Sequence, residues 1–545
     1  MNELIELWNK HTFKITAVIV APLLLAFFVS KVQAENIEEI VVYAQAVETT
    51  QTDPLTGSTL FSAIMPEKTW IAGGSGASTM FRERGAQSVH TAVYRNGIPA
   101  NNPGSGWYDF GHDIVSGENV KVISGANGVM YGSGSIAGTV LIQDTIDTSA
   151  TVRLGSDIHQ YVSVAPTSWF QYTDFSVVQE ARNDNEEKDK YENKSAKIIA
   201  DAGDFKVIVH AVDYAYDYDN CYTVTFTQSN DCLQDGEKLS VSVRNEYFTI
   251  GRTEEQAEYF TEGVSTYQND SSRDYFRVGD TTKLSNLLEV TYGVDGSREK
   301  YNEHETDNYG AFLSIDAQFA LNYNFGFRVG NDDQHAMRLG ISKDQFFFNV
   351  GTSFRKPNLY EVYGDSYVDA NEELLPEEGT GYEAGFGAIS IFLYDFEQSI
   401  EYTPAFAILD IWTNAKYYNA GSYQTKGVRF SNTFGPLSIM LKVNDTDQAR
   451  IPRYVTVITF KKTYNDIDFK LKYAGQFDRK PSMYDVVSSE FLDDLTKLNF
   501  YATKRFSNNI NISFKAENIT NEQAEVLPFY SNEGREFYLT IQYNW

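Results

Sequence analysis

The residue types best suited to chemistry gather between Asp217 and Glu237. This segment holds the only two cysteines of the chain, Cys221 and Cys232, and four aspartates accompany them: Asp217, Asp219, Asp231 and Asp235. Calcium takes several oxygen ligands from carboxylates and carbonyl groups, so the aspartates predict either a calcium site or a solvated acidic loop. Zinc is disfavoured because the segment contains no histidine to join the two cysteines.

No catalytic signature accompanies these residues. The chain contains no HExxH, GxSxG or CxxC pattern, which would indicate a zinc protease, a serine hydrolase or a redox dithiol. An enzyme is therefore not expected, and function has to be inferred from the elements that position the polar and aromatic residues.

A glycine-rich segment, Asn119 to Ile142, is the most informative stretch of the chain. Two β-branched runs, 120–123 and 139–142, flank five glycines: Gly125, Gly128, Gly132, Gly134 and Gly138. A phosphate-binding loop would need a helix and a Lys-Ser/Thr pair after the glycines, and neither follows here. Glycine tolerates positive φ, so the pattern predicts two strands joined by tight turns.

The N-terminus carries an export signal. An apolar run from Ile15 to Val29 follows Lys10 and Lys14, and small residues precede a cleavage point after Ala34. This predicts a signal peptide over residues 1–34; a retained anchor is the alternative, although the run is short for a membrane span. In an oxidising periplasm, Cys221 and Cys232 are expected to form a disulfide.

Composition favours an outer-membrane barrel. The chain has 36 Tyr, 36 Phe, 38 Gly and a mean hydropathy of −0.37, too polar for a helical membrane protein. Barrel strands expose only one face to lipid, which accounts for this balance. The net charge of −29 argues against nucleic acid as a partner and is assigned mainly to solvated loops.

Strict alternation runs from about residue 146 to the end. In the last strand one face is apolar and ends on an aromatic residue: Phe537, Leu539, Ile541, Tyr543 and Trp545. The strand before it repeats the pattern with Ile510, Ile512, Phe514 and Ala516. A period of two indicates strands with two different environments.

The ordered motifs of the chain resemble those of TonB-dependent outer-membrane receptors. The glycine-rich segment resembles the core of that family's plug domain, Ala92–Pro99 its "VxVDGVP" strand, and Ser353–Gly364 its "FRAPxLxELYG" block. Asn371–Glu377 and Tyr382–Phe386 are similar to the "NPxLxPE" and "YExGF" blocks that follow. Overall, the chain is closest in appearance to the cobalamin and siderophore transporters of the family.

The resemblance implies an all-β membrane protein. It predicts a transmembrane antiparallel barrel of about 22 strands, with an N-terminal α+β plug domain in its lumen. The expected division is 1–34 signal peptide, 35–50 TonB box and linker, 51–145 plug and 146–545 barrel. Three longer loops are expected outside the cell: 217–237, 251–274 and 363–380. Trp545 resembles the terminal aromatic residue read by the barrel assembly machinery, and a monomer in outer-membrane lipid is expected.

A β-prone octet directly follows the export signal. It resembles the family's TonB box, which adds a strand to the TonB protein, with ExbB and ExbD behind it; its residues are Glu38, Glu39, Ile40, Val41, Val42 and Tyr43. The alternative is an ordinary flexible leader. The implied function is active uptake with no covalent chemistry: substrate binds outside, and force transmitted by TonB rearranges the plug.

The plug departs from the family pattern at its attachment. Arg84 matches one arginine of the latch that holds the plug to the barrel, but Ser124 and Ala126 replace the Arg and Pro around Gly125. Few residues separate the TonB box from Arg84. A plug of reduced size with a weaker latch is therefore predicted.

The segment 101–112 resembles the plug apex that meets ligand. Trp107, Tyr108 and Phe110 are predicted to offer aromatic surfaces to a planar or macrocyclic ligand, or alternatively to pack against the barrel wall. The family's cobalamin transporters carry a calcium site in an early Asp-rich loop, which supports a structural calcium at 217–235; no other cofactor is expected.

The ligand itself is only narrowed by the sequence. No histidine lies between Phe354 and Pro376, where the family's haem receptors usually place one, so haem is disfavoured. The expectation is uptake of a scarce nutrient such as cobalamin or a ferric siderophore. The alternative is a binding-only receptor or adhesin with a degenerate plug.

Overall fold

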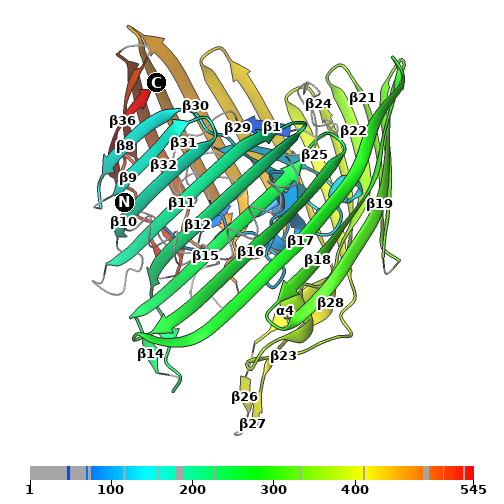
Figure 1. The fold of residues 1–545 in the computed structure, drawn as a ribbon, viewed down its shortest axis with the longest axis horizontal. Helices are drawn as coiled ribbons and strands as arrows, with labels where there is room; N and C mark the ends of the chain where they lie inside the picture. The colour runs from blue at the N-terminus through cyan, green and yellow to red at the C-terminus, as the bar shows by residue number, and fades with distance from the viewer. Residues whose placement is uncertain are drawn as a thin grey trace.

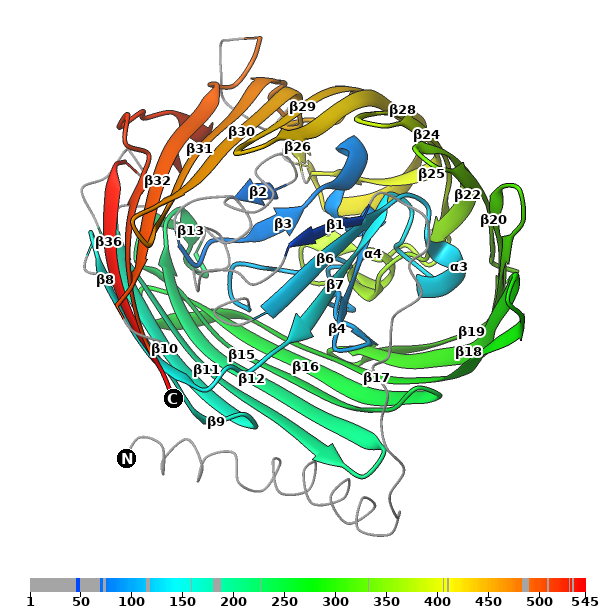
Figure 2. The same cartoon turned by 90° about the horizontal axis from the view of Figure 1, so that it is seen from above.

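The chain forms a closed β-barrel around a smaller inner sheet in the computed structural model (Figure 1, Figure 2). The structure describes residues 46–49, 69–71, 75–113, 118–157, 159–179, 188–225, 227–331, 333–404, 406–408, 411–482, 490–506, 509–528, 530–531 and 534–545. The predicted signal peptide and TonB box lie outside these residues. No helix within the described part is long and apolar enough to cross a membrane.

Twenty-two antiparallel strands, counted over the described residues, close the barrel. In chain order they are β8 (Ser149–Gly155), β9 (Gln160–Thr167), β10 (Phe170–Gln179), β11 (Asp189–Ala202), β12 (Phe205–Tyr218), β15 (Cys232–Arg244), β16 (Phe248–Thr261), β17 (Val264–Ser285), β18 (Leu288–Tyr301), β19 (His304–Gln318), β20 (Asn322–Gly330), β21 (His335–Lys343), β22 (Phe346–Arg355), β24 (Glu377–Phe386), β25 (Ile389–Thr403), β28 (Ala415–Phe434), β29 (Leu437–Thr446), β30 (Pro452–Tyr464), β31 (Ile467–Arg479), β32 (Leu495–Arg505), β33 (Ile510–Glu517) and β36 (Glu536–Asn544). A short parallel pairing of β23 (Val368–Asp369) with β28 is additional to this ring. The predicted strand number is confirmed.

Alternation along each strand separates lumen from lipid, as predicted. In β36 the side chains of Phe537, Leu539 and Ile541 are 44–49% exposed, whereas those of Tyr538 and Thr540 are buried. Since a lipid-facing side chain counts as exposed in the isolated chain, the apolar set forms part of the membrane-facing band.

The first and last strands close the ring. β36 pairs with β8 from Tyr538 opposite Gly155 to Asn544 opposite Ser149. A Cβ atom on Gly155 would collide with the ring of Tyr538, so glycine is required where this aromatic residue lies across the seam. The side chain of Trp545 donates from Nε1 to the carbonyl oxygen of Pro166 at 3.3 Å.

A five-stranded sheet fills the lumen beside two short hairpin strands (Figure 2). Its order is β1 (Ala46–Thr49), β6 (Glu118–Ser124), β7 (Gly138–Asp144), β4 (Thr91–Arg95) and β5 (Ile98–Pro99), while β2 (Thr69–Ile71) pairs with β3 (Thr79–Phe81). The glycine-rich segment forms antiparallel β6 and β7, as predicted, with α3 (Gly128–Tyr131) in the connection.

One face of the inner sheet packs against other apolar residues of the plug, and the other face points toward the barrel wall. The first joins Val93, Val120 and Val140 in one buried cluster. Glycines of the barrel wall leave room for side chains of the plug. A Cβ on Gly326 would lie 2.9 Å from Cγ1 of Val129, and one on Gly379 would collide with Ile136. The plug is thus fitted to its barrel by close approach as well as by charge.

The connections at the two ends of the barrel differ in length. β8 begins and β36 ends at the rim where the plug is joined to the barrel. Because successive strands run in opposite directions, the connections between them lie alternately at the opposite rim and at this one. The opposite rim carries β13 (Cys221–Tyr222), β14 (Gln228–Ser229), α4 (Leu359–Tyr363), β26 (Phe406–Ile408) and β27 (Ile411–Thr413) (Figure 1). Long connections of such barrels lie outside the cell.

The prediction of a long outer loop at residues 251–274 is wrong. Residues 251–274 form the ends of β16 and β17, which meet in a two-residue turn at Glu262 and Gly263. The sequence there is polar on both faces because these strands extend past the membrane into water. Cross-strand ion pairs join their outward faces, with Arg252 Nη1 2.7 Å from Asp274 Oδ1, and such pairs stabilise sheets by a few tenths of a kcal/mol to about 1 kcal/mol.

Candidate functional site

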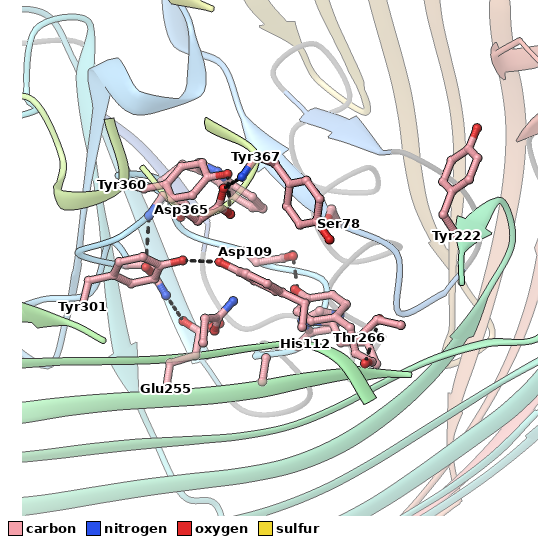
Figure 3. A pocket seen from close by; sticks show the side chains of 18 of the residues that line it. Ser78, Asp109, His112, Tyr222, Glu255, Thr266, Tyr301, Tyr360, Asp365 and Tyr367 are labelled. Carbon is pink, nitrogen blue, oxygen red and sulfur yellow. Dashed lines mark hydrogen bonds and ion pairs between the residues drawn. The ribbon is translucent and has the colours of Figure 1, made fainter. Parts of the chain in front are cut away.

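A pocket of about 640 Å³ lies between the plug and the barrel wall at the rim of the long loops (Figure 3). Its volume is within the range of small-molecule binding sites. Plug, strand ends and loops all contribute to it. The lining residues on which the following argument depends are Trp107, Asp109, His112, Tyr222, Glu255, Tyr259, Tyr267, Tyr301, Tyr360, Asp365 and Tyr367.

The plug loop at the base of the pocket is folded by its own polar side chains. Asn102 Oδ1 accepts the backbone N–H groups of Gly104 and Ser105 at 2.8 and 3.1 Å. Asp109 Oδ1 accepts those of Thr79 and Gly111 at 3.0 and 2.8 Å. The base of the pocket is therefore preorganised before a ligand arrives.

Only one of the three predicted aromatic residues lines this pocket. Trp107 is half-buried at its edge, whereas Tyr108 and Phe110 are buried in the plug core and do not face a ligand. The segment is extended, so its side chains alternate, and 108 and 110 both point toward Phe81 and the sheet. The alternative, packing against the barrel wall, does not describe Tyr108 and Phe110 either, because both are buried in a cluster of plug residues.

Six tyrosines supply most of the aromatic surface instead. They come from the β13 hairpin, from the ends of β16 to β18 and from α4 and its following loop: Tyr222, Tyr259, Tyr267, Tyr301, Tyr360 and Tyr367. Tyr267 and Tyr301 share a hydrogen bond between their hydroxyls at 2.6 Å, and the Tyr360 hydroxyl donates to Asp365 at 3.1 Å. No motif marks these residues, because tyrosine is common at inward positions throughout this chain.

Charge in the pocket is negative. Three carboxylates line it, those of Asp109, Glu255 and Asp365, and no lysine or arginine is among the described residues that line it. His112 stacks on Tyr214 with ring centroids 4.0 Å apart. Burial lowers the pKa of His112 below its usual 6.5, so its ring is neutral near pH 7.

The two cysteines form a disulfide that shapes one wall. Cys221 and Cys232 are bonded, 11 positions apart, at the base of the loop that carries Tyr222 and Val224 into the pocket. The disulfide was predicted from export to an oxidising compartment and from the presence of only two cysteines in the chain.

Opening this disulfide is expected to weaken binding without harming the barrel. The double variant Cys221→Ser/Cys232→Ser loses about 3 kcal/mol of loop constraint by the chain-entropy estimate. Since Tyr222 moves with the loop, ligand affinity should fall by about three- to tenfold. Heat-modifiable migration on gels, which reports the folded barrel, should be unchanged. Unaltered affinity would exclude the disulfide from the site.

The four aspartates of this segment do not assemble into a calcium site. Asp217 and Asp235 lie on the outward faces of β12 and β15, where Asp217 pairs with Leu233 and Asp235 with Ala215. Asp219 is buried and Asp231 is exposed. Among the described residues no group of three or more histidine, cysteine or acidic side chains could hold a metal ion. Asp217 and Asp235 share the outward face of neighbouring strands, but Asp219 is buried and Asp231 lies in the loop before β15, so the four carboxylates do not converge and the predicted calcium site does not fit their arrangement.

Helix α4 connects the pocket with the plug attachment. Asn358 and Glu361 form a reciprocal capping box at its start. Its first backbone N–H groups reach the plug loop, that of Leu359 donating to the Pro103 carbonyl at 3.1 Å. Glu361 also binds Arg355 at 2.8 Å, and Arg355 in turn pairs with Glu377.

On the plug, His90 contacts the Glu377 end of this chain of ion pairs. Its Nε2 lies 2.8 Å from Oε2 of Glu377, and its ring stacks on Phe396 with centroids 4.8 Å apart. No residue pattern in the sequence had indicated this contact.

Arg84 lies where the predicted latch requires it. Its guanidinium is buried, 2.9 Å from Oε1 of Glu383 on β24 and stacked over Phe392. Burial alone would lower the pKa of Arg84, but the carboxylates of Glu383 and Glu83 raise it above the usual value. Ser124, which replaces the second latch arginine, donates to Glu83 at 2.7 Å.

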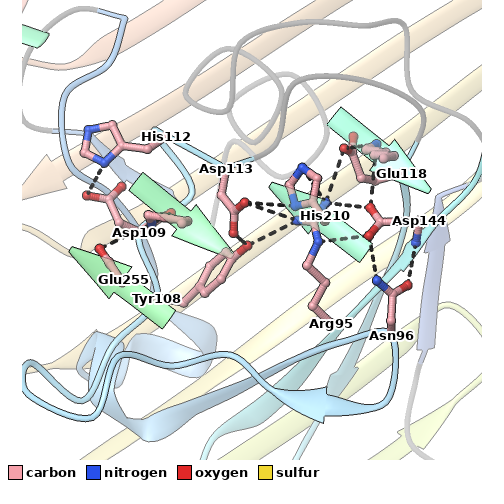
Figure 4. Close-up of polar contacts among 12 residues, drawn as sticks. Arg95, Asn96, Tyr108, Asp109, His112, Asp113, Glu118, Asp144, His210 and Glu255 are labelled. Atoms are coloured by element: carbon pink, nitrogen blue, oxygen red, sulfur yellow. Dashed lines mark hydrogen bonds and ion pairs between the residues drawn. The ribbon is translucent and has the colours of Figure 1, made fainter. Parts of the chain in front are cut away.

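A buried charge cluster makes a further attachment that sequence reasoning missed (Figure 4). On the plug, Arg95 binds Asp144 at 2.5 Å and lies 3.6 Å from Asp113. On the barrel, Lys197 of β11 pairs with Glu118. His210 of β12 lies 3.4 Å from Asp113. All six side chains are 7% exposed or less. The plug therefore has one latch fewer than the family pattern but is held by two additional polar contacts.

Comparison with known proteins identifies the class of this plugged barrel. The family model "TonB dependent receptor-like, beta-barrel" matches residues 133–519, and "TonB-dependent Receptor Plug Domain" matches residues 29–139. The first match alone covers more than half of the chain. The chain therefore belongs to the TonB-dependent receptor family, whose members are outer-membrane receptors and transporters of Gram-negative bacteria that act with TonB on small-molecule ligands.

Individual relatives have low sequence identity to this chain but match most of its length. The chain is 23% identical to the vitamin B12 transporter BtuB of Vibrio cholerae over 558 residues, covering 87% of each. Among solved structures, it resembles the copper transporter OprC with a TM-score of 0.68 and 11% identity, covering 92% of this chain and 98% of that one. A variant of the ferric enterobactin receptor PfeA of Pseudomonas aeruginosa gives 0.67, 13%, 92% and 98%. These structural likenesses establish the fold alone.

Proposed function

We propose that this protein imports a scarce nutrient across the outer membrane, with cobalamin as the first candidate ligand and a ferric siderophore as the second. The pocket carries the proposal: it faces the long-loop rim, it is lined by Trp107 and six tyrosines, and the plug closes its base. Aromatic faces suit flat ring systems. The likeness to a vitamin B12 transporter over 87% of both chains favours cobalamin over the siderophores.

Transport in this proposal consists of binding, release of the plug and passage. The ligand occupies the pocket from outside. TonB, energised by ExbB and ExbD, captures residues 38–43 by strand addition and pulls. The plug then leaves its contacts with the wall, and no covalent bond of the ligand is made or broken. The protein acts as a monomer after insertion by the barrel assembly machinery, which recognises the end of β36 at Trp545.

Proline in the TonB box separates transport from binding alone. The double variant Val41→Pro/Val42→Pro removes two backbone donors from the strand that TonB would extend. In cells lacking their own receptor, uptake of labelled cyanocobalamin should fall at least about tenfold while surface binding is retained. The matched control, Val41→Ala/Val42→Ala, keeps both donors and should transport. Unchanged uptake by the proline variant would contradict TonB-driven transport, whereas binding without uptake by the original protein would favour a binding-only receptor or adhesin.

A further inference from the structure

We propose that the pocket selects its ligand by charge: it accepts flat, ring-bearing molecules that are neutral or cationic overall and rejects polyanionic ferric chelates. This inference rests on the proposed function, since it concerns the ligand of the same pocket. It also separates the two candidate classes that the relatives leave open.

The argument begins with the charges that line the pocket. Asp109 is on the plug, Glu255 on β16 and Asp365 after α4, so carboxylates approach the cavity from three separate elements. One cation stands close behind them: Lys238 Nζ lies 3.5 Å from Glu255 Oε1 and its side chain is 10% exposed. With His112 neutral, these groups leave a net charge of about −2 at the cavity.

These carboxylates are fixed in place. Asp365 Oδ1 accepts the backbone N–H groups of Tyr367 and Val368 at 2.7 and 3.0 Å. Glu255 Oε2 accepts from Asn102 at 2.9 Å. Neither group can turn away from an approaching anion without losing hydrogen bonds, so the negative field is built into the pocket.

Nearby arginines do not offset this field. Arg273, which lies below the plug loop, is 2.9 Å from Glu299 and donates to the Asn101 carbonyl. Arg328 is bound by Asp295, and Arg355 by Glu361 and Glu377. Each positive charge is thus paired within the wall before a ligand enters.

The aromatic surface acts in the same direction. The faces of tyrosine and tryptophan rings carry negative quadrupole density, which attracts cations and N–H groups and repels anions. Trp107 lines the cavity from the plug, and the six tyrosines line it from the barrel strands and the outer loops. A flat ligand edged with amide N–H groups meets ring faces and acceptors, whereas a polyanion meets like charge on both sides.

Binding of three probes to the purified full-length protein in detergent tests the inference. The probes are cyanocobalamin, which is neutral and carries a flat ring, and trianionic ferric enterobactin; ferrioxamine B, a cationic ferric chelate without a flat ring, tests the effect of charge alone. Quenching of intrinsic fluorescence gives each Kd. Cyanocobalamin or ferrioxamine B should bind at least about 100-fold more tightly than ferric enterobactin. Equal or tighter binding of the trianion, or no binding of either other probe, would overturn the proposal.

Charge-neutral variants assign the selectivity to named residues. Glu255→Gln/Asp365→Asn keeps an acceptor oxygen at each position and removes two negative charges. The trianion should then bind at least about tenfold more tightly than it does to the original protein. The matched control Glu258→Gln removes one charge from the outward face of the same strand and should leave every affinity unchanged. An unchanged affinity for the trianion in the double variant would refute the role of these carboxylates.

The two proposals fail in distinguishable ways. Binding to purified protein needs neither TonB nor a proton gradient. A protein that binds the neutral probe but does not import it contradicts the proposed function alone, and one that imports the trianion contradicts the charge selection alone.

Discussion

Replacing Arg95 with methionine is expected to loosen the plug more than any other single substitution in this chain. Methionine fills similar space but leaves Asp144 and Asp113 buried without their principal cation. Removing one partner from a buried ionic network costs about 3–5 kcal/mol, since the remaining charges have lost their solvent and gained nothing. The plug should therefore detach from β11 and β12 at lower denaturant concentrations than in the original protein.

Ion conductance of the protein in planar lipid bilayers measures this directly. A seated plug blocks the barrel, so the urea concentration at which channels open reports plug stability. The Arg95→Met variant should open about 2 M earlier, taking a plug of roughly this size to lose about 1–3 kcal/mol per molar urea.

A second substitution provides the control. Adding Asp144→Asn to the Arg95→Met variant removes one stranded negative charge and should restore part of the lost stability. An Arg95→Met protein that opens at the original urea concentration would show that the cluster does not hold the plug.

Removal of the latch guanidinium should have the next largest effect. In Arg84→Ala, Glu383 remains buried with only the Tyr394 hydroxyl, which donates to it at 2.8 Å, and Glu83 is left facing it. The expected loss of plug stability is about 3–4 kcal/mol, seen in the same conductance measurement.

Arg82 is the matched control for this position. Its guanidinium donates to the carbonyl oxygen of Ala449 at 3.0 Å. Arg82→Ala should cost about 1 kcal/mol, the usual contribution of one hydrogen bond. Equal effects of the two substitutions would mean that the loss of side-chain packing, and not the Glu383 ion pair, accounts for the latch.

The barrel was predictable because its physics is local. Alternation at residues such as Phe537 and Leu539 follows from lipid on one side of each strand, and it is visible in any short window. The same rule failed over 251–274, since strands that emerge into water are polar on both faces and carry no alternation.

The functional contacts were less predictable because they join distant parts of the chain. Alternation can say that Lys197 and His210 face inward, but not that Arg95 and its carboxylates lie against them. The prediction that Tyr108 and Phe110 face a ligand failed for a related reason. An aromatic residue in an extended loop is equally consistent with a ligand surface and a core, and only packing decides. The Cys221–Cys232 pair succeeded because the chain offered no other partners.

The seam between β8 and β36 has a consequence for the order of folding. Almost every pairing around the ring joins strands that are neighbours in the chain and can form as successive hairpins at small entropic cost. The seam instead joins residues such as Arg153 and Thr540, 387 positions apart.

Closure of the ring therefore waits until β8 and β36, from opposite ends of the barrel sequence, meet, and until then two strand edges stay open to wrong partners. A truncation that removes β36 would leave the protein as an open sheet, even though every residue that lines the pocket would be present.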